Sequence, residues 1–159
     1  MSVLKARRHE SKAEFVNIAD EIFAETMGFL ARLSNRYQRL LAEDTMHLAS
    51  LVLDHCECAQ NIRICDQVTM NLRETHIVEA RANLMALDVH MSHIWLIITT
   101  NPQGCFTNTK GQTKTPKEAL EILDKMAVSL GEKIDQEKNY LAKLLQTDKE
   151  NYKKSLERE

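Results

Sequence analysis

The sequence predicts an all-α protein, most simply an antiparallel four-helix bundle, and two observations support this. Only four glycines and two prolines occur among 159 residues, which is too few for a turn-rich sandwich or barrel. The long segments between them are rich in good helix formers such as Ala, Leu, Glu, Lys, Gln and Met. Because a chain of this length buries about two thirds of its unfolded surface, we expect one domain that folds on its own core.

The first two helices are predicted from capping signals and apolar spacing. Ser11 is followed three residues later by Glu14, which is a capping-box pattern and predicts a helix starting there. Apolar residues then recur at spacings of three and four up to Leu33, and Ser34-Asn35 ends this helix. A second pattern with nearly a heptad period predicts a helix over residues 37 to 62.

The third helix is predicted from Asp66, a plausible N-cap, to Thr100, and it carries two apolar rows. One row is Ile77, Ala80, Leu84, Leu87, Met91, Ile94 and Ile98, and the other is Val78, Ala82, Met85, Val89 and Leu96. A helix with one partner surface needs only one row, so something else should cover the second. Either another subunit covers it, or this is the most buried helix of a monomer. In the first case, the interface candidates are Val78, Met85, Val89 and Trp95.

Residues 101 to 115 form the one long loop that the sequence predicts, either a small β-hairpin or a surface excursion anchored by Phe106. Thr115, Pro116 and Glu118 then start a fourth helix with a second capping box. Its apolar residues thin out after Leu145. The predicted organisation is therefore a basic arm at 1–10, an up-down-up-down bundle at 11–145 whose longer loop joins the last two helices, and a charged, frayed tail at 146–159.

The charge balance excludes recruitment of nucleic acid or membrane by bulk charge. Lys and Arg number 21 against 23 for Asp and Glu, a formal net charge of −2. No apolar run is long enough for a signal peptide or a membrane span, so we expect a soluble cytoplasmic chain. In that reducing compartment the four cysteines are predicted to be free structural thiols, namely Cys56, Cys58, Cys65 and Cys105.

No pattern in the sequence favours catalysis. The pairs Asp44/His47 and His90/His93 have a spacing that can place two ligands on one helix face, but a di-iron bundle needs two Glu-x-x-His motifs and further glutamates. His55 and Cys56 are helix neighbours, which project about 100° apart and cannot hydrogen-bond to each other. No Gly-rich phosphate loop is present. We therefore expect no catalytic residue, cofactor or metal; a metal-dependent bundle enzyme is the least favoured alternative.

Basic residues gather at the ends of the predicted bundle. Residues 28 to 40 and 101 to 117 contain no acid, and in an up-down-up-down bundle both segments lie at one end. The basic arm would lie at the opposite end. Such basic ends can contact phosphates or a partner protein. The alternative is that these lysines only keep solvent-exposed loops soluble. The candidate binding residues are Arg32, Arg36, Arg39, Lys110, Lys114 and Lys117 at one end, and Lys5, Arg7, Arg8 and Lys12 in the arm.

Several short patterns are similar to those of a known family. These are M-S-V-L-K-x-x-R-x-x-S-K-x-E-F at residues 1–15, Asn17-x-Ala19, Ser34-Asn35-Arg36-Tyr37, and a helix ending in Ala59-Gln60-Asn61-Ile62. Over residues 1–145 the chain resembles the accessory variability determinant (Avd) family, four-helix-bundle proteins encoded beside the reverse transcriptases of diversity-generating retroelements. Related bundles, encoded in intervening sequences of large-subunit ribosomal RNA, share the fold.

The resemblance implies a non-catalytic homo-oligomer, a pentamer in the family, that binds the reverse transcriptase and helps to handle template RNA and cDNA. It also implies that Arg36, Tyr37 and the basic arm are surface determinants of binding. The alternative function is a free-standing bundle that scaffolds RNA or another protein, as the ribosomal intervening-sequence proteins would.

Overall fold

A computed structural model describes residues 13 to 157 of the chain. This part contains four helices: α2 (Glu14–Leu30), α3 (Asn35–Asn61), α4 (Gln67–Thr100) and α5 (Pro116–Leu156). Within the described residues, the only β-type pairing is two isolated bridges at the connections between helices. The predicted all-α, four-helix fold is confirmed.

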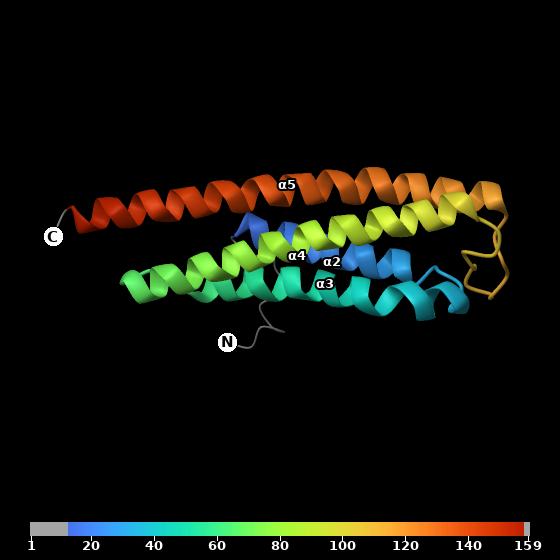
Figure 1. Cartoon of the computed structure of the whole chain (residues 1–159), viewed down its shortest axis with the longest axis horizontal. Helices are drawn as coiled ribbons and strands as arrows, with labels where there is room; N and C mark the ends of the chain where they lie inside the picture. Colours follow the sequence, from blue (N-terminus) through green and yellow to red (C-terminus); the bar gives the residue numbers. More distant parts are fainter. Residues whose placement is uncertain (1–12, 158–159) are drawn as a thin grey trace.

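The helices form a closed ring of neighbours, in which α2 packs on α3, α3 on α4, α4 on α5 and α5 on α2 (Figure 1). The α2–α3 and α4–α5 connections meet at one end of the bundle, and the α3–α4 connection lies at the other (Figure 1). Apolar residues from all four helices fill the centre, among them Ile22, Val52, Leu84 and Leu130. The first apolar row of α4, from Ile77 to Ile98, is buried throughout, as its spacing predicts.

Two of the three helix starts that were predicted from capping residues are confirmed. The Asp66 side chain accepts a hydrogen bond from the Thr69 backbone N–H at 2.8 Å, and Thr115 forms the predicted capping box with Glu118. The predicted capping box at Ser11 is wrong, because α2 begins at Glu14 with Ala13 as its N-cap. Glu14 is then the first helical residue and not the third, where a capping box needs it; Ser11 itself lies outside the described residues.

The charged tail predicted after Leu145 is helical, because α5 continues to Leu156. Two ion pairs join this extension to α4: Asp148 with Arg73, and Lys149 with Glu74, each at 2.6 Å. In the last turns of α5, ion pairs and not apolar contacts hold the helix to α4. Apolar spacing alone therefore does not reveal where α5 ends.

The four cysteines are free thiols, as predicted, but only Cys56 and Cys105 are buried in the core; Cys58 and Cys65 are exposed. Within the described residues, none of the helices is both long enough and apolar enough to cross a membrane.

Candidate functional site

The two connections at the loop end of the bundle pack directly against each other. The Ser34 N–H donates to the Cys105 carbonyl oxygen at 2.7 Å, and the Thr107 N–H donates to the Arg32 carbonyl oxygen at 3.0 Å. An antiparallel bridge pairs Leu33 with Phe106. Residues 31–34 and 101–115, which lie about 70 residues apart in the chain, therefore form one continuous surface.

Phe106 anchors the long loop, as its sequence context predicts. Its side chain is fully buried, and its ring meets the Phe29 ring edge to face, with centroids 5.6 Å apart. Gly104 and Gly111 both have φ of +76°, a conformation that favours glycine, and they turn the chain on either side of this anchor. The loop is thus held to the bundle by its middle.

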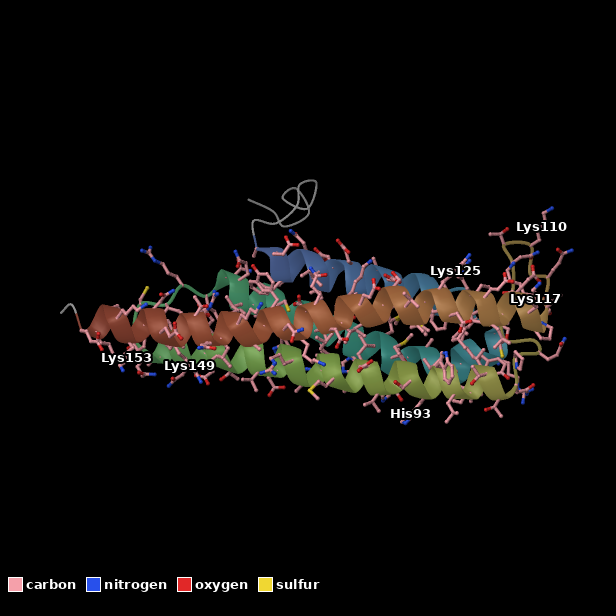
Figure 2. The ribbon with its side chains drawn as sticks, turned by 90° about the horizontal axis from the view of Figure 1, so that it is seen from above. His93, Lys110, Lys117, Lys125, Lys149 and Lys153 are labelled. Carbon is pink, nitrogen blue, oxygen red and sulfur yellow. The ribbon has the colours of Figure 1, made fainter. Side chains whose placement is uncertain are left out.

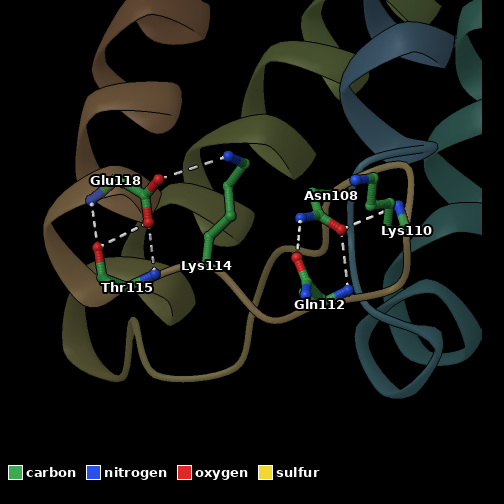
Figure 3. A network of polar contacts seen from close by, with 6 residues as sticks. All are labelled: Asn108, Lys110, Gln112, Lys114, Thr115 and Glu118. Carbon is green, nitrogen blue, oxygen red and sulfur yellow. Dashed lines mark hydrogen bonds and ion pairs between the residues drawn. The ribbon is translucent and has the colours of Figure 1, made fainter.

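Hydrogen bonds also order the tip of the loop. The Asn108 side-chain oxygen accepts from the backbone N–H groups of Lys110 and Gln112, each at 2.9 Å, and the Asn108 amide donates to Gln112 Oε1 at 2.8 Å (Figure 3). This is the asparagine-centred turn chemistry of a tight loop. It fixes the backbone that carries Lys110 at the end of the molecule (Figure 2).

Most of the predicted basic residues at this end are exposed: Arg32, Arg36, Arg39, Lys110 and Lys117. Lys114 differs, because its ammonium lies 3.6 Å from a Glu118 carboxylate oxygen, the one ion pair that any of the six makes with a described residue. Hydrogen bonds from the Thr115 backbone and hydroxyl, with a smaller effect of Lys114, lower the pKa of Glu118. Lys114 therefore contributes less free positive charge than the sequence predicts. We refer to the five exposed cations as the basic end.

Tyr37 does not project from the basic end as its three arginine neighbours do. It is half-buried and packs against the hydrophobic core. A hydrogen bond with the Cys105 thiol and burial raise the pKa of its phenol. Tyr37 therefore packs beneath the surface where α3 meets the loop, and it contacts Cys105 of the loop. The arm residues Lys5, Arg7, Arg8 and Lys12 lie outside the described residues.

The second apolar row of α4 lies on the bundle surface. Val78, Met85, Val89 and Leu96 are 46%, 56%, 53% and 58% exposed. At about 100° per residue these positions lie within a narrow sector, opposite the row that enters the core. The bundle therefore leaves one face of α4 uncovered, and we call these four residues the α4 row.

Trp95 is separate from the α4 row. It lies about 100° around the helix from Leu96 and borders a groove of about 240 Å³ between α4 and α5. The sequence grouped Trp95 with Val78, Met85 and Val89, but the structure places it at the helix edge that faces α5. The groove is lined by Asp88, Met91, Ser92, Trp95, Met126, Ala127, Leu130, Gly131 and Ile134.

A buried polar pair interrupts the core between α3 and α5. The Cys56 thiol donates to Glu137 Oε1 at 3.4 Å, and both side chains are fully buried. Glu137 Oε2 has no hydrogen-bond partner among the described residues. Burial raises the pKa of Glu137 to about 8 and raises that of Cys56 well above its usual range. The carboxyl group is therefore largely protonated at neutral pH, and the thiol is a poor nucleophile.

The histidine and acid pairs noted in the sequence do not gather into a larger cluster. Asp44, His47 and His93 are exposed and His90 is half-buried. His55 turns away from its neighbour Cys56 and meets His76 of α4 instead, at 2.9 Å between their Nδ1 atoms. Over residues 13–157, no group of three or more His, Cys, Asp or Glu side chains is arranged to hold a metal ion.

Comparisons of the chain with family models, with curated proteins and with solved structures give no match.

Proposed function

We propose that the protein is a non-catalytic, oligomeric accessory protein that binds the reverse transcriptase of a diversity-generating retroelement and assists the handling of its template RNA and cDNA. The α4 row is the observation that carries the proposal. Four large apolar side chains on one helix face, each about half exposed, are typical of a surface that another protein covers. A homo-oligomer, a pentamer as the resemblance implies, would bury this face.

The basic end supports the second part of the proposal. Its five exposed cations lie in or beside the two connections, and the Phe106 anchor and the Asn108 hydrogen bonds order the loop that carries Lys110 and leads to Lys117 in the first turn of α5. A fixed cluster of cations can contact phosphates or an acidic protein surface even when the whole chain has a net charge of −2. The position of the connections at alternate ends supports an antiparallel up-down-up-down bundle in which this cluster lies at one pole (Figure 1).

The chemistry of the interior supports a binding role over a catalytic one. Glu137 and Cys56, the polar pair in the core, are fully buried, and burial favours the protonated form of each. Groups in this state are suited neither to attack a substrate nor to accept a proton from it.

The direct test is co-purification of the chain with the reverse transcriptase encoded beside its gene. We expect a stable complex and, by light scattering, an oligomer of the chain alone. A chain with both Arg36→Glu and Lys110→Glu should lose the complex but stay oligomeric, whereas Lys143→Glu with Lys153→Glu, far from the basic end, should keep both. A gene located inside a ribosomal RNA operon, with no polymerase gene nearby, would contradict the proposal and favour the free-standing scaffold.

A further inference from the structure

Two histidines from different helices meet on the side of the bundle that α3 and α4 share. The Nδ1 atoms of His55 and His76 lie 2.9 Å apart, and their ring centroids are 5.2 Å apart with an interplanar angle of 42°. Both side chains are half-buried, so the pair is reachable from solvent while its rings are held by the packing of the two helices. Among the described residues, neither ring forms another hydrogen bond.

The approach of the two nitrogens has a direct chemical meaning. Only one hydrogen fits between two Nδ1 atoms at this distance, so one ring donates its N–H and the other accepts with its lone pair. Nδ1 is one of the two ring nitrogens through which a neutral imidazole can bind a metal ion. The pair therefore offers two neighbouring nitrogen ligands. In the structure these two nitrogens share a single N–H···N hydrogen bond.

The distance between the two nitrogens, which is that of a hydrogen bond, is also compatible with one class of ion. Two imidazole nitrogens at about 2.0–2.1 Å from one ion, and at right angles to each other, lie about 2.9 Å apart. Right-angled nitrogen ligands are typical of square-planar and octahedral coordination, which Ni²⁺ and Cu²⁺ adopt. The observed separation of 2.9 Å equals this spacing, and the two rings would turn their Nδ1 lone pairs from each other toward a common ion. Mg²⁺ and Ca²⁺ prefer oxygen ligands and would not compete.

We propose that His55 and His76 form a two-imidazole site for a divalent transition-metal ion of the Ni²⁺ or Cu²⁺ type, which links α3 to α4 with solvent filling the remaining positions. On binding, the proton leaves the donating Nδ1, and a proton returns from solvent to Nε2 of that ring. Both rings stay neutral, both Nδ1 lone pairs bind the ion, and no oxidant or reductant takes part. This proposal is independent of the proposed function.

The site links residues 21 positions apart, so it exists only in the folded chain. An ion held there binds the native state far better than the unfolded one and must raise stability by mass action. It would act close to Arg73, which lies three residues before His76 and already holds the end of α3 through hydrogen bonds to the Ala59 and Ile62 carbonyl oxygens. The metal would thus reinforce an existing contact between the two helices.

Thermal unfolding of the untagged full chain with NiCl2, paired with calorimetric titration, tests the proposal. We expect one Ni²⁺ per chain and an increase in the unfolding midpoint of about 2–4 °C or more at millimolar Ni²⁺, with no increase in MgCl2. His55→Gln and His76→Gln should each abolish the increase. Matched controls on the same helices, His47→Gln on α3 and His93→Gln on α4, should keep it, as should Cys58→Ser.

Three results would overturn the proposal: an unfolding midpoint of the wild-type chain that Ni²⁺ leaves unchanged, loss of the increase in any control variant, or its persistence in His55→Gln or His76→Gln. If a glutamine variant fails to fold, NMR of the wild-type chain decides. On addition of Ni²⁺, the imidazole signals of His55 and His76 should shift or broaden before those of other histidines. A first response at His90 or His93 contradicts the site.

Discussion

The Nε atom of Arg73 lies 2.6 Å from Oδ2 of Asp148, and this ion pair joins the start of α4 to the last turns of α5. Both side chains are nearly buried, with 13% and 12% of their surface exposed. Arg73 also donates from Nη1 to the carbonyl oxygens of Ala59 and Ile62 at the end of α3, at 2.7 and 3.3 Å. One guanidinium group therefore fixes three helix ends relative to one another.

Removal of one partner of this pair should destabilise the fold. Asp148→Ala leaves the Arg73 charge nearly buried with only carbonyl partners, and we expect the free energy of unfolding to fall by about 2–4 kcal/mol. The measurement is urea denaturation followed by circular dichroism.

The exposed neighbouring pair provides the matched control. Lys149 lies 2.6 Å from Glu74 but is half-exposed, so Lys149→Ala should cost at most about 1 kcal/mol. If both variants lose the same free energy of unfolding, the burial of Arg73 and Asp148 does not make their ion pair more stabilising than an exposed one.

The Arg73–Asp148 pair also shows where prediction from the sequence stops. Helix starts at Asp66 and Thr115 are predictable because their capping partners lie three residues away in the chain. The core row of α4 is predictable because its spacing repeats along one helix. Arg73 and Asp148 are 75 residues apart, and no local pattern couples them, so the thinning of apolar residues after Leu145 does not mark the end of α5.

The same distinction holds for the candidate sites. The α4 row and the basic residues of the two connections are visible in the sequence as a second apolar row and two acid-free segments. The ion pair of Lys114 with Glu118, the half-buried position of Tyr37 and the contact between His55 and His76 all depend on packing or side-chain geometry. The separation of Trp95 from the α4 row follows from helix geometry at about 100° per residue, whereas the groove that it borders beside α5 depends on packing.

The stability of the protein should fall as the pH rises above about 5, because of Glu137. Its pKa in the folded chain is raised to about 8 from an ordinary value of 4.5. Between these values the folded state holds a proton that the unfolded state has lost. The free energy of unfolding should then decrease by up to about 1.4 kcal/mol per pH unit, and the loss should level off above pH 8.

Glu137→Gln isolates this effect, since it keeps the size and polarity of the side chain but cannot ionise. Denaturant unfolding at several pH values between 5 and 8 should give a smaller slope for the variant than for the wild type. Glu132→Gln, an exposed residue of the same helix, should leave the slope unchanged. If the free energy of unfolding changes with pH equally in the wild type and in Glu137→Gln, other groups cause the pH dependence.

The α4 row should determine the oligomeric state. Met85→Glu together with Val89→Glu places two carboxylates on the exposed face, and their burial between subunits would cost several kcal/mol. We expect light scattering to give a smaller particle, with an unchanged helical circular dichroism spectrum because neither residue enters the core. Val128→Glu replaces an equally exposed apolar residue of α5 and should leave the particle size as it is. A monomeric wild-type chain at micromolar concentration would contradict the interface.

The basic end should determine any binding to RNA or DNA. Arg32, Arg36 and Arg39 are exposed and come from the α2–α3 connection and the first turns of α3, beside the loop that carries Lys110. Each phosphate contact contributes about 0.7 to the slope of log K against log salt for single strands and about 0.9 for duplexes. Reversal of all three arginines to glutamate should therefore weaken binding and flatten the slope by up to about 2–3, with little change in the unfolding midpoint.

A reversal of three cations far from the basic end, Lys143, Lys153 and Lys154, is the matched control, because it changes the net charge by the same amount. Figure 2 shows Lys153 at the opposite end of the bundle from Lys110 and Lys117. If binding depends on position, only the arginine triple variant changes the slope. If both triple variants weaken binding equally, total charge governs it and the basic end is not a site. If the wild-type chain binds no nucleic acid even at low salt, its net charge of −2 outweighs the local cluster, and the five cations are left to contact an acidic protein surface.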